Sequence, residues 1–261
     1  MWILLLKLGQ LDWGYYISSV WRDNDYDTPR YLYFSTNDGK ANINIRTANN
    51  SVNVDTVAIS GVMLKMTITG WTNSPVVSNT LNASVINKGL IITSDVPVLG
   101  YFALENAENG MIIVAKGKEA LGQSFRVTTQ TKTSINSTSE RLHFASVIAS
   151  EDNTTVTFNN GTNNIKGVGS STQTATLNKG QTYMVQPENS DKFFGSLLIT
   201  SDKPITVQGG SQFTTIPSTG NQDGSGEQLM PVHYAGKEHI IARGNSMATA
   251  GDYAIVTAIE T

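Results

Sequence analysis

The chain has 261 residues, a formal net charge of −3 and only 15% charged residues. This length can bury a substantial core, and scattered basic residues give no electrostatic footprint for nucleic acid or an anionic membrane. The chain has no cysteine, which excludes disulfides, thiolate catalysis and Cys-based zinc sites. No run of about 18 apolar residues occurs, so we expect no membrane-spanning helix.

The first residues do not have the features of a secretion signal. The apolar run in residues 1–7 is shorter than a signal-peptide core, and it has neither a basic lead nor a small-residue cleavage site. A secreted form of this protein would therefore carry its signal peptide upstream.

Aromatic residues are dense near the N-terminus. Exposed rings beside polar groups suit glycan or protein recognition. Strand alternation offers a second interpretation, since rings two residues apart share one face and at least half of them would then lie in the core. The ligand-binding residues stay unassigned. The aromatic set is Trp13, Tyr15, Tyr16, Trp21, Tyr26, Tyr31 and Tyr33.

An acidic run within this region predicts the candidate metal site. Asp23, Asp25 and Asp27 place hard oxygen ligands at alternate positions, as a Ca²⁺ loop does, although the glycine and distal glutamate of an EF-hand are missing. Residues 221–227 offer a second set of oxygen ligands. Solvated acidic loops have the same composition, so both interpretations stay open. Calcium is the single cofactor that the sequence suggests.

Alternating polar and aliphatic residues predict β-strands along most of the chain. Residues 42–45, 66–69 and 155–158 each place one side-chain type on each face. Thr, Ser and Asn exceed the charged residues, and Thr favours half-exposed strands while Asn favours turns. The best helical candidate, residues 103–108, is too short for more than one turn. The sequence therefore predicts an all-β fold.

One heptapeptide occurs in two similar copies. Residues 92–98 are ITSDVPV and residues 199–205 are ITSDKPI. Asp can fold its side chain onto the following backbone, and Pro presets φ while lacking a donor, so each copy predicts a strand, a turn and a second strand. The similarity continues outside the heptapeptide, which predicts a long internal repeat.

Similar acidic hairpins begin near residues 35, 94, 150, 201 and 258, and their spacing predicts the division of the chain. We expect a lead-in region at residues 1–30, one β-repeat unit at 31–143, a second at 144–253, and the truncated start of a third at 254–261.

Two architectures of antiparallel hairpin units fit this spacing. In a β-propeller each interval is one four-stranded blade, whereas in two tandem β-sandwich modules each pair of intervals is one eight-stranded unit. Recurrence of the acidic hairpin at half the period favours the propeller-like arrangement. The tight turn within residues 177–183 favours the sandwiches.

Four motifs resemble a known family in order and spacing. They are ASEDNTTVTF (149–158), LNKGQTYMVQ (177–186), GSLLITSDKPITVQGGS (195–211) and GEQLMPVHYAGKEHIIA (226–242). Together they resemble the N-terminal domain of the immunoglobulin-G Fc-binding protein, which also occurs in bacterial surface proteins. The resemblance implies an extracellular, non-catalytic module for adhesion or for binding a surface protein or glycan, and it does not imply antibody binding. Loop 217–226 lacks the cysteine frequent in the family, which favours a bacterial member.

Candidate catalytic residues are few. The three histidines, His143, His233 and His239, form no recognisable triad or metal motif, so we assign no catalytic residue. A polysaccharide hydrolase remains an alternative if hairpin acids converge at one rim. The simpler interpretation is that each acid caps its own turn. The acids are Asp95, Glu151, Asp152 and Asp202. A third alternative is a purely structural spacer in a large surface protein.

Overall fold

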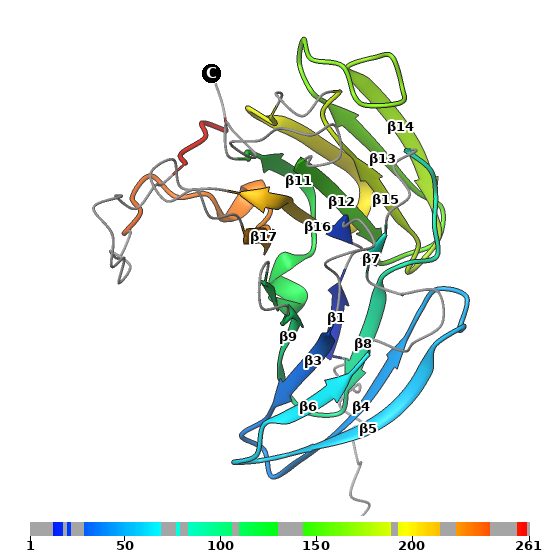
Figure 1. Ribbon diagram of the computed structural model, residues 1–261, viewed down its shortest axis with the longest axis vertical. Coiled ribbons are helices and arrows are strands. Elements are labelled where there is room, and N and C mark those ends of the chain that lie inside the picture. Colours follow the sequence, from blue (N-terminus) through cyan, green and yellow to red (C-terminus); the bar gives the residue numbers. More distant parts are fainter. Residues whose placement is uncertain are drawn as a thin grey trace, which may run out of the picture.

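The computed structural model describes residues 13–17, 20–21, 29–68, 77–78, 83–105, 110–129, 143–188, 193–214, 223–240 and 255–259. It is an all-β fold (Figure 1), as the sequence predicts. None of its described helices is long and apolar enough to cross a membrane.

The first half of the chain forms two four-stranded antiparallel sheets. Sheet one has the order β1 (Trp13–Ile17), β8 (Leu90–Ser94), β4 (Lys40–Arg46), β5 (Asn53–Ile59). Sheet two has the order β10 (Met111–Ala115), β9 (Leu99–Leu104), β3 (Arg30–Ser35), β6 (Leu64–Thr67). The short β2 (Val20–Trp21) and β7 (Val77–Ser78) pair in parallel. We call sheets one and two the first module.

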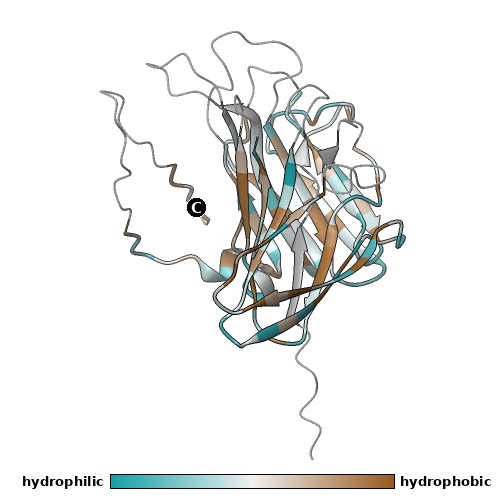
Figure 2. Cartoon of the chain, turned by 60° about the horizontal axis from the view of Figure 1, so that its bottom comes forward, coloured by the Kyte–Doolittle hydropathy of each residue, from teal (hydrophilic) through white to brown (hydrophobic). Residues whose placement is uncertain are grey.

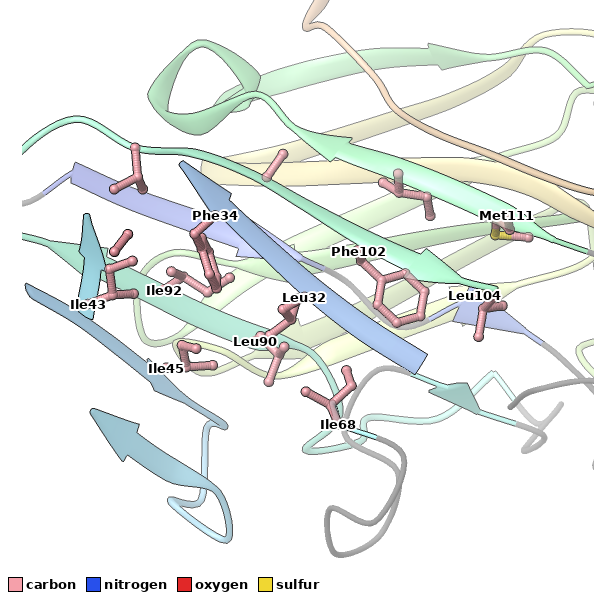
Figure 3. Packing of buried hydrophobic residues seen from close by; sticks show 14 of the residues in the cluster. Leu32, Phe34, Ile43, Ile45, Ile68, Leu90, Ile92, Phe102, Leu104 and Met111 are labelled. Carbon is pink, nitrogen blue, oxygen red and sulfur yellow. The ribbon is translucent and has the colours of Figure 1, made fainter. Parts of the chain in front are cut away.

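Strand alternation places an apolar core between these two sheets. In β4 the residues Ala41, Ile43 and Ile45 are buried while Asn42 is exposed. Leu32 and Phe34 of β3 approach them from sheet two, as Figure 3 shows. Burying such side chains contributes about 1.5–3 kcal/mol each, so this shared core holds the two sheets together.

The second half forms one seven-stranded sheet, the second module. Its strands are β11 (Gly122–Val127), β12 (His143–Ala149), β13 (Thr154–Asn159), β14 (Thr172–Leu177), β15 (Thr182–Val185), β16 (Leu197–Thr214) and β17 (Asp223–Gln228). The start of β16 pairs with β11 and β13, and its later part pairs with β12 and β17. The sheet therefore folds over along β16 into two layers, nearly closing like a barrel around one core.

The two modules have the same strand order. The layer β1-β8-β4-β5 corresponds to β11-β16-β13-β14, and the layer β10-β9-β3-β6 corresponds to β17-β16-β12-β15. In the first module the chain changes layers between β8 and β9, and in the second it does so within β16. Colouring by hydropathy shows apolar and polar segments alternating along strands of both modules (Figure 2).

Matching hydrogen bonds hold the two layer changes, which are the two heptapeptides. Ser94 Oγ donates to the Val96 carbonyl over 2.8 Å, and Ser201 Oγ donates to the Lys203 carbonyl over 2.7 Å. The carboxylate of Asp95 accepts the backbone N–H of Asn42 over 2.8 Å. In the second module Asp202 accepts the backbone N–H of Thr155 over 2.7 Å. Each aspartate therefore ties the layer change to the neighbouring strand.

This strand order is that of the tandem sandwiches. A propeller blade pairs four consecutive strands in one meander, whereas here consecutive strands alternate between layers, with β3 and β6 in one sheet and β4 and β5 in the other. The favoured propeller-like arrangement is therefore not observed.

The predicted division of the chain stays a prediction, and two strand pairs cross its boundaries. β11, which the unit 31–143 would include, pairs with β16 of the second module, and β1, from the lead-in region 1–30, pairs with β8 of the first. The third unit at 254–261 stays a prediction, since residues 255–259 are described without a strand.

The second module packs on the first through one of its outer faces. Phe144 of β12 and Met184 of β15 belong to the core cluster of the first module, and Ile148 clusters with Ile91 of β8. At the edge, β17 lies against β10, where a Cβ on Gly226 would approach Ile113 to 2.8 Å. The 3₁₀ helix η1 (Gly117–Ala120) connects β10 to β11.

The chain after β17 packs against the second module beside β11. Leu229 packs against its core. Pro231 sits so close to Gly122 that a Cβ on this glycine would lie 2.4 Å from the proline ring. The 3₁₀ helix η2 (Val232–Tyr234) follows and contacts β11.

Candidate binding surfaces

The outer face of sheet two carries aromatic and aliphatic side chains. Leu32 and Phe34 point into the core, so the alternating residues of β3 face outward, and the same argument holds for β6, β9 and β10. We call this surface the tyrosine face. Its residues are Tyr31, Tyr33, Lys65, Leu99, Tyr101, Ile112 and Val114.

The rings on this face are fixed by one another and by an ion pair. Tyr33 and Tyr101 stack with centroids 4.6 Å apart, and Lys65 Nζ lies 3.7 Å from the ring centroid of Tyr31. Lys65 also pairs with Glu105 over 2.8 Å, and the Tyr33 hydroxyl donates to the same carboxylate. These contacts give the face a defined shape before any partner arrives.

Local charge and burial shift the pKa values of these groups. The Lys65 ammonium, followed by the Tyr33 hydroxyl, lowers the pKa of Glu105. Burial first, and then the hydrogen bond to Glu105, raises the pKa of Tyr33. Glu105 raises the pKa of Lys65. Lys65 and Glu105 are therefore both charged at neutral pH and offset each other's charge.

Three aliphatic side chains of this face are exposed to solvent. Leu99 is 71% exposed, Ile112 60% and Val114 48%. Single exposed apolar residues are ordinary, but a contiguous apolar patch marks an interaction surface. Ile112 lies opposite Ala103, and Val114 lies opposite Tyr101, in the β9–β10 register. The aliphatic residues thus adjoin the stacked rings.

A polar hollow of about 470 Å³ lies on the opposite side of the first module, on sheet one. Asn42 and Asn44 of β4, Asp55 and Val57 of β5, and Thr93 and Asp95 line it, among others. The Asn44 amide nitrogen donates to Asn53 Oδ1 over 2.8 Å and to Asp55 Oδ1 over 2.9 Å. Hydrogen bonds from the side chain and the backbone of Asn42 lower the pKa of Asp95.

The predicted aromatic cluster is placed only in part. Tyr31 and Tyr33 face away from the core, because Leu32 and Phe34 occupy the inner positions of β3. Their hydroxyls explain why the tyrosines face outward, because a buried hydroxyl needs a hydrogen-bond partner and a phenylalanine ring does not. Trp13, Tyr15, Tyr16 and Trp21 lie in strands whose side chains are not described, and Tyr26 lies outside the described residues.

The predicted calcium ligands Asp23, Asp25 and Asp27 lie outside the described residues. In the second candidate, residues 223–227 belong to the strand β17 instead of a loop. Glu227 there forms an ion pair with Lys116. Within the described part of the chain, no three acidic or histidine side chains group together in a way that could hold a metal.

The hairpin acids hold turns. Asp152 accepts the backbone N–H of Lys179 over 2.9 Å, and Asp95 and Asp202 bond their neighbouring strands in separate modules. The hydrolase alternative needs carboxylates that converge on one rim. Those carboxylates would have to include acids that already cap turns. Of the histidines, His143 is buried in β12, and the ring of exposed His239 bonds the Gly236 carbonyl.

Sequence reasoning missed most of the two surfaces. Lys65 lies in β6, whereas Leu99 and Tyr101 lie in β9, so only the pairing of both strands with β3 brings them together. The one available signal was residues 111–115, MIIVA, an apolar run that suggests a strand buried on both sides. In the fold this strand is covered on one face only.

Comparison with known proteins identifies one family. A family model described as IgGFc binding protein matches residues 113–260, which is more than half of the chain. The matched region contains the whole second module and the end of β10. No curated protein and no solved structure matches the chain.

Proposed function

We infer a binding function for this chain, which belongs to the IgGFc binding protein family. We propose that it is a non-catalytic module that docks a protein partner on the tyrosine face. The observation that carries the proposal is the exposure of Leu99, Ile112 and Val114 beside stacked tyrosines. Binding surfaces typically combine aromatic anchors with such aliphatic contacts.

The state of the rings favours a protein over a glycan on this face. A sugar that stacks on an aromatic residue needs a free ring surface. Tyr33 and Tyr101 use one surface on each other, Tyr33 is only 8% exposed, and Lys65 covers the ring of Tyr31. What remains exposed is mainly aliphatic, which suits an apolar protein surface.

The corresponding layer of the second module also supports the proposal, because its outer face already forms an interface. Its face β17-β16-β12-β15 corresponds to the tyrosine face and is buried against the first module. This layer is therefore able to form an extensive protein interface. In the first module the corresponding layer exposes its apolar residues.

We place this function outside the cell, in adhesion or surface binding. The family supports an extracellular setting, and a bacterial surface protein remains our proposal for its source. A structural spacer that adds further modules by the same packing is less well supported. Leu229 and Pro231 already cover part of the second module beside β11.

Surface plasmon resonance against a panel of purified extracellular proteins, with an antibody Fc fragment among them, would test the proposal. We expect a panel protein to bind the full chain, and the double variant Leu99→Asp/Ile112→Asp to weaken that binding about 10-fold or more. Both positions are exposed, so the melting temperature should hardly change.

The matched control is Thr157→Asp/Thr174→Asp on the outer face of the second module, which should leave binding intact. Loss of binding in the control but not in the tyrosine-face variant would contradict the proposal, and so would a panel without any binder.

A further inference from the structure

We propose that the hollow on sheet one is a second binding site, for a neutral saccharide, in which Asn42, Asn44 and Asp55 bond the sugar hydroxyls. This site is on the other sheet of the first module from the tyrosine face. It does not depend on a protein partner.

The hydrogen bonds of the hollow leave acceptors available. Asn44 uses its amide nitrogen on Asn53 and on one oxygen of Asp55, which leaves the Asn44 side-chain oxygen and the second Asp55 oxygen without a partner among the described residues. Asn42 donates its amide to Asp95, which leaves its side-chain oxygen as well. These bonds also fix the side chains, so a ligand meets acceptors that are already positioned.

The second module shows that the fold does not require these residues. In the matching register its layer has Thr155 and Thr157 in place of Asn42 and Asn44, and Thr174 in place of Asp55. Thr157 and Thr174 bond each other through their hydroxyls over 3.2 Å. The layer forms equally with threonine, so the amide and carboxylate groups of the first module need another explanation.

The turn aspartate occurs in both modules. This comparison separates the residues that the fold requires from those that it does not require. Asp95 and Asp202 both cap a neighbouring strand. Asp95 is therefore explained by the fold. Asn44 and Asp55 are not, and together with the side-chain oxygen of Asn42 they are the groups that we assign to the ligand.

The chemistry of the lining selects the ligand class. Carboxylate and amide oxygens accept hydrogen bonds from neighbouring hydroxyls, and the bonds to a carboxylate are the stronger ones. Val57, which is 39% exposed, supplies an apolar wall for the C–H face of a sugar ring. Two carboxylates repel sialylated or sulfated sugars, so the saccharide is uncharged.

A cation fits the hollow less well. Both oxygens of Asp95 already accept hydrogen bonds from Asn42, so only Asp55 retains a carboxylate oxygen without a described partner. Calcium takes six to eight oxygen ligands. The single remaining carboxylate with two amide oxygens is a weak set for that ion.

The test is a titration of the full chain with neutral hexose and N-acetylhexosamine oligosaccharides, with sialylated and sulfated oligosaccharides and Ca²⁺ as separate arms, followed by NMR chemical shifts. We expect a neutral oligosaccharide to shift the resonances of residues 42–44 and 55. The double variant Asn44→Thr/Asp55→Thr, which carries the residues of the second module, should bind about 10-fold more weakly.

Two matched variants make the outcome specific. Thr157→Asn/Thr174→Asp in the second module should leave binding unchanged, and so should Leu99→Asp/Ile112→Asp on the tyrosine face, which separates this site from the proposed protein site. An unchanged affinity in Asn44→Thr/Asp55→Thr would overturn the proposal. The absence of any shift with neutral saccharides, or a response to Ca²⁺ or charged sugars alone, would overturn it as well.

Discussion

The outer faces of two corresponding layers have the same backbone pairing and opposite surroundings. In the second module this face is buried against the first module, and in the first module it is the tyrosine face. In matching register the pairs are Tyr31 with Phe144, Tyr33 with Ser146, Lys65 with Met184, and Tyr101 with Gln208. Strand pairing is therefore compatible with either set of outward-facing side chains. Whether another module covers the face decides which set is present.

Polarity follows burial at two of these pairs, Lys65 with Met184 and Tyr31 with Phe144, whereas Ser146 and Gln208 are polar and buried. Met184 fills part of the core of the first module. Its counterpart Lys65 has a half-exposed side chain and an ion-pair partner. Phe144 has no hydroxyl to satisfy, whereas Tyr31 is half-buried and its hydroxyl can hydrogen-bond to water. A long charged side chain at the position of Met184 would be buried without a partner, which is costly.

The largest effect on stability is expected when Phe144→Ala is compared with Tyr31→Ala. Phe144 is fully buried, so its truncation leaves a cavity between the modules and should lower the free energy of unfolding by about 3–5 kcal/mol. Tyr31 is only partly buried, and its truncation should cost about 1 kcal/mol. Urea unfolding of both variants measures the difference. Equal losses would contradict the assignment of one face as an interface and the other as free.

A smaller effect is expected where the modules differ by one methyl group. Ala103 of β9 corresponds to Gly210 of β16. A Cβ on Gly210 would lie 2.2 Å from the Ser225 carbonyl oxygen, so Gly210→Ala should destabilise the protein by about 1–3 kcal/mol through overpacking.

The reverse change, Ala103→Gly, is the control for this site. It should cost only about 0.5–1 kcal/mol, from the greater entropy of glycine in the unfolded chain. Thermal unfolding compares the two variants. A neutral Gly210→Ala variant would show that β17 is not held against β16 as closely as described.

Local sequence predicted the strands and the layer changes, and non-local pairing decided the rest. Ser-Asp-x-Pro located both turns because their hydrogen bonds lie within a few residues, as those of Ser94 and Ser201 do. The same turn chemistry fits a blade or a sandwich, so it could not decide the architecture. That depended on β3 pairing with β9, about 70 residues away.

The two surfaces were harder to predict for the same reason. Tyr31 and Tyr33 alternate with Leu32 and Phe34, and all four can fill a core, so parity alone left the exposed face undecided. The hollow combines Asn44, Asp55 and Thr93 from three strands. No segment of the sequence contains that set.

The smallest predicted effect concerns the two turn aspartates. Asn42 lowers the pKa of Asp95, first through its side-chain amide and then through its backbone N–H. Its counterpart Thr155 bonds Asp202 by the backbone N–H and has no amide. Asn42→Thr should therefore give Asp95 the environment of Asp202 and raise its pKa toward the ordinary value of about 3.9. An NMR titration of the Asp95 carboxyl group measures this shift.

The sign of the accompanying change in stability follows from linkage. Because the folded pKa of Asp95 lies below the unfolded value, its stabilising contribution is complete above the unfolded pKa and is lost as the pH falls through the folded pKa. Asn42→Thr should therefore lower the melting temperature slightly at pH 7. The deficit should shrink as the pH falls below about 4 and through the folded pKa of Asp95, because protonation of Asp95 removes the charge that the amide stabilises. A deficit that stays constant down to pH 2 would mean that Asn42 stabilises the turn by packing and not through the carboxylate of Asp95.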